Sequence, residues 1–175
     1  MSGAAAQTSL WCPKGESPDR PGRGMVKCIT ICQPWPWAIV WKLKRIENRT
    51  WPTKWRGLLC IHAGLSEKWL GGYASIGNGP EPEKSGLVFG AIVGVVDMSA
   101  CLARAEVSLG KLKSAGLSEA EAQAQRLYAE GPWCHIYTHV RRFVEPVPYK
   151  GAQGLFDVPL GVVGEALRTA VEVGT

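Results

Sequence analysis

The sequence predicts an α+β fold, a small mixed β-barrel of about six strands flanked by helices. Three observations predict it: strand-like runs recur along the chain, helical signals fall between some of them, and the regular strand–helix alternation of a parallel sheet is missing. At 175 residues the chain is long enough for one domain with its own core. Its apolar fraction of 46% and charged fraction of 20% are those of a globular protein.

The predicted strands are apolar or alternating runs bounded by proline, glycine or polar turns. Residues 26–33 (VKCITICQ) are β-branched and alternate until Pro34 ends the run. Residues 87–98 (LVFGAIVGVVDM) are apolar on both faces, and Gly90 and Gly94 on one face predict tight curvature or a close backbone approach. The other predicted strands are 45–50, 57–63, 133–143 and 154–158.

The clearest predicted helix covers residues 116–131. Ser118 and Glu121 have the spacing of a capping box, and Gly131 is a stop signal. Further helices are predicted over 34–43, 66–76 and 159–173, and a loop over 77–86.

The first 24 residues are rich in Gly, Ser, Pro and Ala, so we expect a flexible tail over 1–24 before a domain over 25–175. No apolar run approaches the length of a membrane span, and the N-terminus lacks the apolar core of a signal peptide. We therefore expect a cytoplasmic protein without a membrane partner.

Six cysteines form no CxxC pair and no Cys/His cluster at zinc spacing. We interpret them as reduced structural thiols, and we predict neither a metal site nor a cofactor. The net charge of +5 and the pI near 9.0 moderately favour an anionic partner.

Residues 41–57 (WKLKRIENRTWPTKWRG) hold six cationic side chains, three tryptophans and one carboxylate, Glu47. If this stretch is extended, Arg45, Glu47 and Arg49 share a face. Lys44 lies at the preceding turn, where the pleat of the strand does not fix its direction and leaves it free to point at the same place. Flanking guanidinium groups would keep Glu47 ionised, which suits it to orient an arginine or to accept a hydrogen bond from a ligand amine. Charge alone favours a different interpretation, a solvated strand with weak ion pairs.

Tryptophans shift the interpretation toward a ligand pocket. Six of the eight fall between residues 35 and 69. Flat rings beside cations are how proteins stack bases and neutralise phosphate. Some of these rings belong to the core, and Trp37 and Trp41, one helical turn apart, are the predicted core pair.

The three histidines are interpreted from strand alternation. His62 is predicted to be a buried, hydrogen-bonded core residue, with a place at the rim of a cleft as the alternative. His135 and His139 flank Tyr137 on a polar face with Arg141, so we expect this face to be exposed, with contact to RNA as an alternative.

Several separated segments carry a resemblance to a known family. QPWPWAIVWKLKRIENRTWPTKWRGLLCIHAG, then GAIVGVVDM, GPWCHIYTHVRRF and PVPYKGAQGLFDVP, resemble in order the segments of the ASCH domain, of the PUA-like superfamily. The likeness covers residues 26 to about 160. It implies a PUA-like β-barrel flanked by helices, with a cleft that recognises RNA or a nucleotide-like small molecule.

The family hallmark G-x-K-x-x-E-x-R matches this chain at Lys44, Glu47 and Arg49. The resemblance implies that these three line the ligand cleft. If the cleft is catalytic, Lys44 and Glu47 are the candidate residues, with Lys44 as a general acid or electrostatic stabiliser. Lys42 stands where the family has glycine; it would be strained if that position has a positive φ, or it extends the cationic rim.

The leading hypothesis is therefore binding of single-stranded RNA or a nucleotide-like ligand. Trp51 and Trp55 would form walls of the cleft and Arg56 would lie on the phosphate track, so affinity should fall steeply as salt rises. One alternative is a hydrolase for RNA or a modified nucleoside. The acetylcytidine hydrolases of the family resemble this motif with a threonine nucleophile where this chain has Glu47, so their mechanism is not carried over. The other alternative is a protein-interaction module that docks through its tryptophans. Oligomeric state is not predicted.

Overall fold

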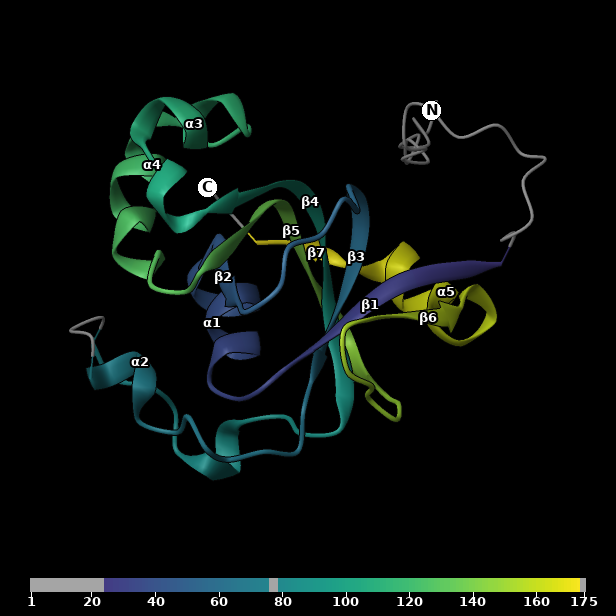
Figure 1. The fold of residues 1–175 in the computed structure, drawn as a ribbon. Helices are drawn as coiled ribbons and strands as arrows, with labels where there is room; N and C mark the ends of the chain where they lie inside the picture. The colour runs from purple at the N-terminus through teal and green to yellow at the C-terminus, as the bar shows by residue number, and fades with distance from the viewer. Residues whose placement is uncertain (1–23, 76–78, 174–175) are drawn as a thin grey trace, which may run out of the picture.

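The computed structural model describes residues 24–75 and 79–173 as a single sheet with helices around it (Figure 1). The strands are β1 (Met25–Ile31), β2 (Ile46–Arg49), β3 (Gly57–Ala63), β4 (Ala91–Ala103), β5 (Trp133–Pro148), β6 (Leu155–Pro159) and β7 (Val171–Glu172). The helices are α1 (Trp35–Lys42), α2 (Gly72–Ser75), α3 (Leu109–Ser114), α4 (Glu119–Gln125) and α5 (Leu160–Thr169), with 3-10 turns η1 (Lys84–Gly86), η2 (Arg104–Glu106) and η3 (Arg126–Tyr128). The predicted α+β class is confirmed. The predicted tail falls outside the described residues except for Gly24.

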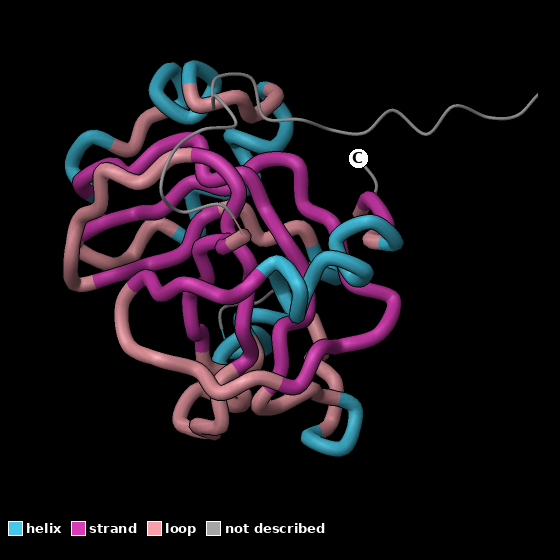
Figure 2. The backbone as a smooth tube through the Cα atoms, turned by 90° about the vertical axis from the view of Figure 1, so that its right-hand side faces the viewer, coloured by secondary structure: helices cyan, strands magenta, loops and turns pink. Residues whose placement is uncertain are grey.

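The sheet has seven strands in the order β2-β5-β4-β3-β1-β6, with β7 paired to β5. β1 and β3 are parallel, and the other pairs are antiparallel. Among the described residues no pairing joins β2 to β6, so the sheet is open at both edges. Figure 2 shows the strands through the middle of the molecule with helical segments around the outside.

Both faces of the central strands are buried, and successive residues enter different parts of the core. Along β1, Ile29 and Ile31 enter the cluster that includes Ile39 of α1, whereas Cys28 packs with Val163 of α5 on the other face. This two-sided burial explains why these strands read as nearly continuous apolar runs.

The long strand β4 bends as it crosses the sheet. Its pairing with β5 shifts register at three places, and each shift is a bulge or irregularity that increases local twist. At Gly94 an added Cβ would lie 2.6 Å from the carbonyl oxygen of Arg141 and 2.8 Å from Val40, which confirms the predicted close approach. Gly90, just before the strand, has a positive φ of 67°, a left-handed conformation that glycine adopts without strain.

Helix boundaries differ most from those predicted. The Ser118–Glu121 capping box is confirmed, but α4 ends at Gln125 and passes into a 3-10 turn. Helix α3, capped by Ser108, lies ahead of it and was not predicted. The C-terminal helix ends at Thr169 because the chain then adds β7 to the edge of β5. None of the helices in the described part of the chain is long and apolar enough to cross a membrane.

Candidate functional site

A left-handed turn at the end of α1 delivers Lys44 to the interior. Leu43 has φ 56°, and the backbone N–H groups of Leu43 and Lys44 both donate to the carbonyl oxygen of Ala38. The amide side chain of Gln125, from α4, supports the turn: its oxygen accepts from Arg45 N at 2.6 Å, and its nitrogen donates to the Leu43 carbonyl oxygen at 3.0 Å. Helix α4 therefore fixes the residues that lead into β2.

Lys44 and Glu47 form a buried ion pair. The Lys44 Nζ lies 2.8 Å from Glu47 Oε2 and also donates to the Ile46 carbonyl oxygen. The two residues are only 2% and 6% exposed. The same ammonium lies 5.2 Å from the ring centroid of Trp35 and 5.6 Å from that of Tyr128, within the range of cation–π attraction. Aromatic rings therefore replace water around this charge.

The second cation beside Glu47 is Arg49. One guanidinium nitrogen of Arg49 lies 3.5 Å from Glu47 Oε1 and donates to the Thr30 carbonyl oxygen at 2.8 Å. The prediction that Arg45 also flanks Glu47 is wrong. β2 begins only at Ile46, and Arg45, held in the preceding turn, pairs with Glu121 of α4 at 3.2 Å.

These groups face a cleft of about 320 Å³. Three aromatic side chains line it, from α1, from the segment before α2 and from η3: Trp35, Trp69 and Tyr128. Its charged lining residues are two cations, Lys44 and Arg49, and two carboxylates, Glu47 and Glu130. The formal charges of the lining therefore cancel, although the chain as a whole carries +5.

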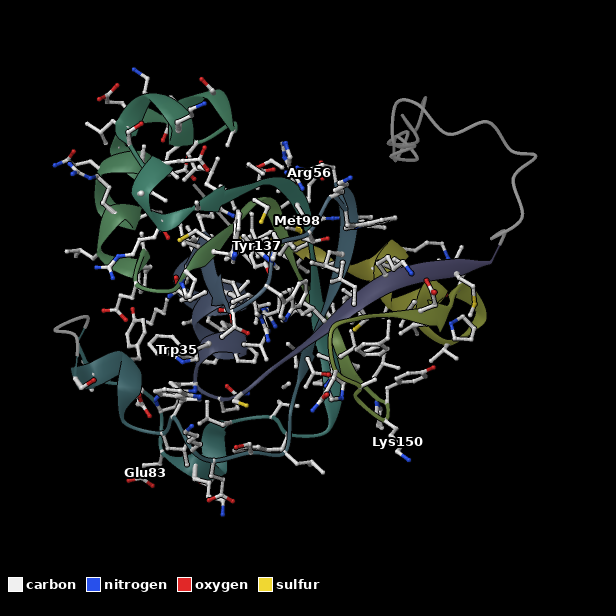
Figure 3. The ribbon with its side chains drawn as sticks, viewed as in Figure 1. Trp35, Arg56, Glu83, Met98, Tyr137 and Lys150 are labelled. Carbon is white, nitrogen blue, oxygen red and sulfur yellow. The ribbon has the colours of Figure 1, made fainter. Side chains whose placement is uncertain are left out.

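The other predicted site residues lie elsewhere. Trp51 lines a second hollow beside Arg49. Trp55 lines neither depression and packs against the core. Arg56 is exposed and donates to the carbonyl oxygen of Trp55, and Figure 3 shows it well separated from Trp35.

Lys42 is not strained, contrary to one expectation, and it does not extend the rim of the cleft. It is the last residue of α1, and the positive φ falls on Leu43 instead. Its Nζ lies 5.6 Å from the ring of Trp37 on the exposed surface. The prediction that Trp37 and Trp41 form a core pair is wrong for Trp41, which is 53% exposed and stacks on the guanidinium group of Arg142.

Asn48 ties β2 to the segment that carries Tyr128, a role that sequence patterns did not indicate. Its side-chain nitrogen donates to the Tyr128 carbonyl oxygen at 2.8 Å, and its side-chain oxygen accepts from Gly131 N at 2.9 Å. Gly131 packs so closely that an added Cβ would lie 2.6 Å from the Asn48 Cβ. The cleft wall is held by this fit.

We expect Gly131→Ala to lower the free energy of unfolding by about 1–3 kcal/mol, because the new methyl group overlaps Asn48 and forces the strand and the loop apart. Urea denaturation would measure the change. Gly110→Ala is the matched control, since an added Cβ there meets no atom within 4 Å. That control should be neutral or stabilising, because alanine is the better helix former; an equal loss in both variants would contradict the packing argument.

Behind the cleft, β5 buries two polar side chains that were predicted to be exposed. His135, opposite Glu47 in the β2–β5 pairing, and Tyr137 are both 0% exposed, because neighbouring strands and α1 enclose this part of β5. Burial, reinforced by the charge of Arg49, lowers the pKa of His135 to about 4. Burial and the charge of Glu47 raise the pKa of Tyr137, so both groups are neutral at pH 7.

The remaining histidines follow the predictions more closely. His139 is exposed, with φ 46°. His62 is buried, and its Nε2 lies 2.9 Å from the Tyr149 carbonyl oxygen. Its predicted place in the core is confirmed, although its Nδ1 has no hydrogen-bond partner among the described residues.

The structure also bears on metal and disulfide chemistry. Of the six cysteines, the five within the described ranges carry free thiols. Cys28 and Cys60 are buried, whereas Cys32, which lies in the same predicted strand as Cys28, is half-buried. In the same ranges, no group of three or more His, Cys, Asp or Glu side chains could hold a metal ion.

Comparison with protein-family models finds no matching family, and comparison with curated proteins finds no matching sequence. The resemblance to ASCH domains therefore stays a prediction, and a functional argument has to begin from the cleft itself.

Proposed function

We propose that the cleft binds RNA or a nucleotide-like ligand by enclosing one of its bases, and that the protein acts in the cytoplasm. The observation that carries the proposal is the buried Lys44–Glu47 pair, held between the rings of Trp35 and Tyr128 at the cleft floor. Bases stack on aromatic side chains, and their edges present both amine donors and carbonyl acceptors. A carboxylate and an ammonium group side by side complement such an edge.

The charge of the cleft favours a base over a phosphate group. Lys44 and Arg49 are each paired with Glu47, and Glu130 adds a second carboxylate to the lining. A phosphate placed here would have to compete with Glu47 for both cations, whereas an uncharged base would not. We therefore expect a weaker salt dependence than the sequence alone predicted.

We further propose that the fold is that of an ASCH domain with a PUA-like barrel. Two features support this. The motif residues Lys44, Glu47 and Arg49 meet in one cleft, as the resemblance implies. The guanidinium group of Arg49 on β2 donates to the carbonyl oxygen of Thr30 on β1, although β5, β4 and β3 lie between these two strands in the sheet order. A strongly curved sheet, as in a barrel, brings such distant strands together.

Binding is preferred to hydrolysis because of how Glu47 is engaged. One oxygen lies against Lys44 and the other lies near Arg49. Both oxygens of Glu47 are therefore held by cations of the protein, so a catalytic role for Glu47 would require one of these contacts to break.

Substituting an exposed cleft tryptophan tests the proposal. Trp69 lines the cleft but is 49% exposed, so Trp69→Ala should fold normally. We expect it to weaken binding of a short single-stranded RNA by about 5- to 100-fold, the loss of one stacking contact. Titration calorimetry would measure it, with Trp41→Ala as the matched control, since Trp41 is similarly exposed but lies outside the cleft.

Equal affinities of wild type, Trp69→Ala and Trp41→Ala would place the binding site elsewhere and contradict the proposal. Incubating excess RNA with the protein in the same series distinguishes the hydrolase, which alone would yield product beyond one equivalent.

A further inference from the structure

A second hollow of about 640 Å³ adjoins the cleft. Its walls come from the residues after β2 and from the loop between β5 and β6, and they include Thr50, Trp51, Ala152 and Gln153. Thr30 and Arg49 line both depressions, so the two are continuous around these residues. The loop that forms the far wall lies within the segment PVPYKGAQGLFDVP, which carries part of the family resemblance but holds no predicted site residue.

The electrostatics of the two depressions differ. Among the described residues, Arg49 is the only charged one that lines the second hollow, and none of these residues adds a carboxylate there. Its side chain is 21% exposed, and its contact with Glu47 is the longer of the two cation contacts in the cleft, 3.5 Å against 2.8 Å for Lys44. An anionic group is therefore better accommodated at Arg49, on the side of the second hollow, than at Lys44.

The β5–β6 loop, which forms one wall of the hollow, is held in place by contacts with the strands beneath it. The Tyr149 carbonyl oxygen lies 2.9 Å from His62 Nε2. Gly151 sits so close to the sheet that an added Cβ would lie 2.5 Å from the His62 ring and 2.6 Å from Thr30 Oγ1. The loop thus rests on the buried side chain of His62 on β3 and the half-buried side chain of Thr30 on β1, which gives the hollow a defined wall. Trp51 is anchored on the opposite wall, with its ring 5.1 Å from that of His135.

We infer that the ligand is a single strand of at least two nucleotides that crosses Arg49. One base occupies the cleft, the phosphodiester lies at Arg49, and the next nucleoside lies in the second hollow against Trp51. The inference rests on the proposed function and adds to it the class of ligand, an oligonucleotide in preference to a free nucleoside or mononucleotide. Thr50 and Gln153 supply polar groups for the sugar or the second base.

Calorimetry with a nucleoside and with the matching dinucleoside monophosphate tests the inference on the full chain. We expect the dinucleoside monophosphate to bind at least about 5-fold more tightly, as one added stacking contact implies. Its log K should fall with log salt at a slope of about −0.7, the value for one neutralised phosphate on a single strand, while the nucleoside should show almost no slope.

Ala152→Trp should fill the exposed hollow without reaching the cleft. We expect it to abolish the gain from the second nucleotide and to leave nucleoside affinity within about twofold, because stacking in the cleft is retained. Ala120→Trp, at an exposed position on α4, is the matched control and should change neither affinity. If Ala152→Trp fails to fold, Gln153→Ala, at an exposed loop position, should reduce the same gain.

The calorimetry results distinguish failure of the second subsite from failure of the proposed function. Equal binding of nucleoside and dinucleoside monophosphate by the wild-type protein overturns the second subsite and leaves base binding in the cleft intact. A gain that survives both Ala152→Trp and Gln153→Ala overturns the assignment of this hollow. Absence of binding by either ligand overturns the proposed function itself.

Discussion

Replacing Lys44 with methionine is expected to lower the free energy of unfolding by about 3–5 kcal/mol, because the change leaves a carboxylate buried without its closest cation. Methionine keeps most of the side-chain volume, so the packing of Trp35 and Tyr128 is preserved. Chemical denaturation monitored by tryptophan fluorescence would measure the loss. RNA binding should be lost as well, because the cleft floor would lose the ammonium group that complements the edge of a base.

Two further variants test whether the stability lost in Lys44→Met comes from a buried, unpaired charge. The pair between Lys27 and Asp157 has the same 2.8 Å separation but is solvent-exposed, so Lys27→Met should cost less than about 1 kcal/mol. The double variant Lys44→Met with Glu47→Leu removes both buried charges and should recover most of the stability, but not the binding. A double variant as unstable as Lys44→Met alone would show that the loss comes from packing and not from an unpaired charge.

Acid sensitivity is the second large effect we expect, and His135 is its main source. The pKa of His135 is about 4 in the folded protein, against about 6.5 in an unfolded chain. Between these values the unfolded chain binds more protons, so stability is complete above about pH 6.5 and is lost as the pH falls toward 4. The shift corresponds to about 3 kcal/mol. His62, whose pKa burial also lowers, adds to the loss in the same direction.

Unfolding free energies of wild type and His135→Phe, measured from pH 7 to pH 4, would test this origin. The charged groups that act on His135 are Glu47, Arg49 and Arg56. Phenylalanine keeps an aromatic ring against Trp51 but does not titrate, so most of the decline between pH 6.5 and 4 should disappear. His139→Asn removes an exposed imidazole from the same strand and tolerates its positive φ, which makes it the matched control. An unchanged decline in His135→Phe would assign the acid sensitivity to other groups.

The parts of the fold that the sequence predicted well are those whose signals are local. The strands β1, β3 and β4 could be predicted because each is a run of mainly apolar residues. The capping box of α4 is read within four residues of the chain, from Ser118 to Glu121. The three motif residues Lys44, Glu47 and Arg49 lie so near in sequence that one turn and one short strand suffice to gather them.

What the sequence did not predict depends on contacts between distant segments. Tyr128 lines the cleft from a part of the chain with no pattern to mark it as a site residue. Trp69 belongs to the group of six tryptophans that indicated a pocket, but nothing in the sequence assigned it to the cleft. The partner of Arg45 is Glu121, on a helix more than seventy residues away. Alternation placed His135 on a polar face, but alternation does not reveal that neighbouring strands and a helix cover both sides of β5.

The bridge made by Gln125 has a consequence for how the site could be isolated. Its amide holds Leu43 and Arg45 in place from 80 residues further along the chain, and the next turn of the same segment carries Tyr128. A peptide cut from the basic, tryptophan-rich stretch 41–57 would keep Lys44, Glu47 and Arg49 but would lose the aromatic wall and the support of the turn. The smallest fragment that preserves the pocket therefore has to extend at least from β1 to the start of β5. The pocket is thus a property of most of the domain and not of the stretch 41–57 alone.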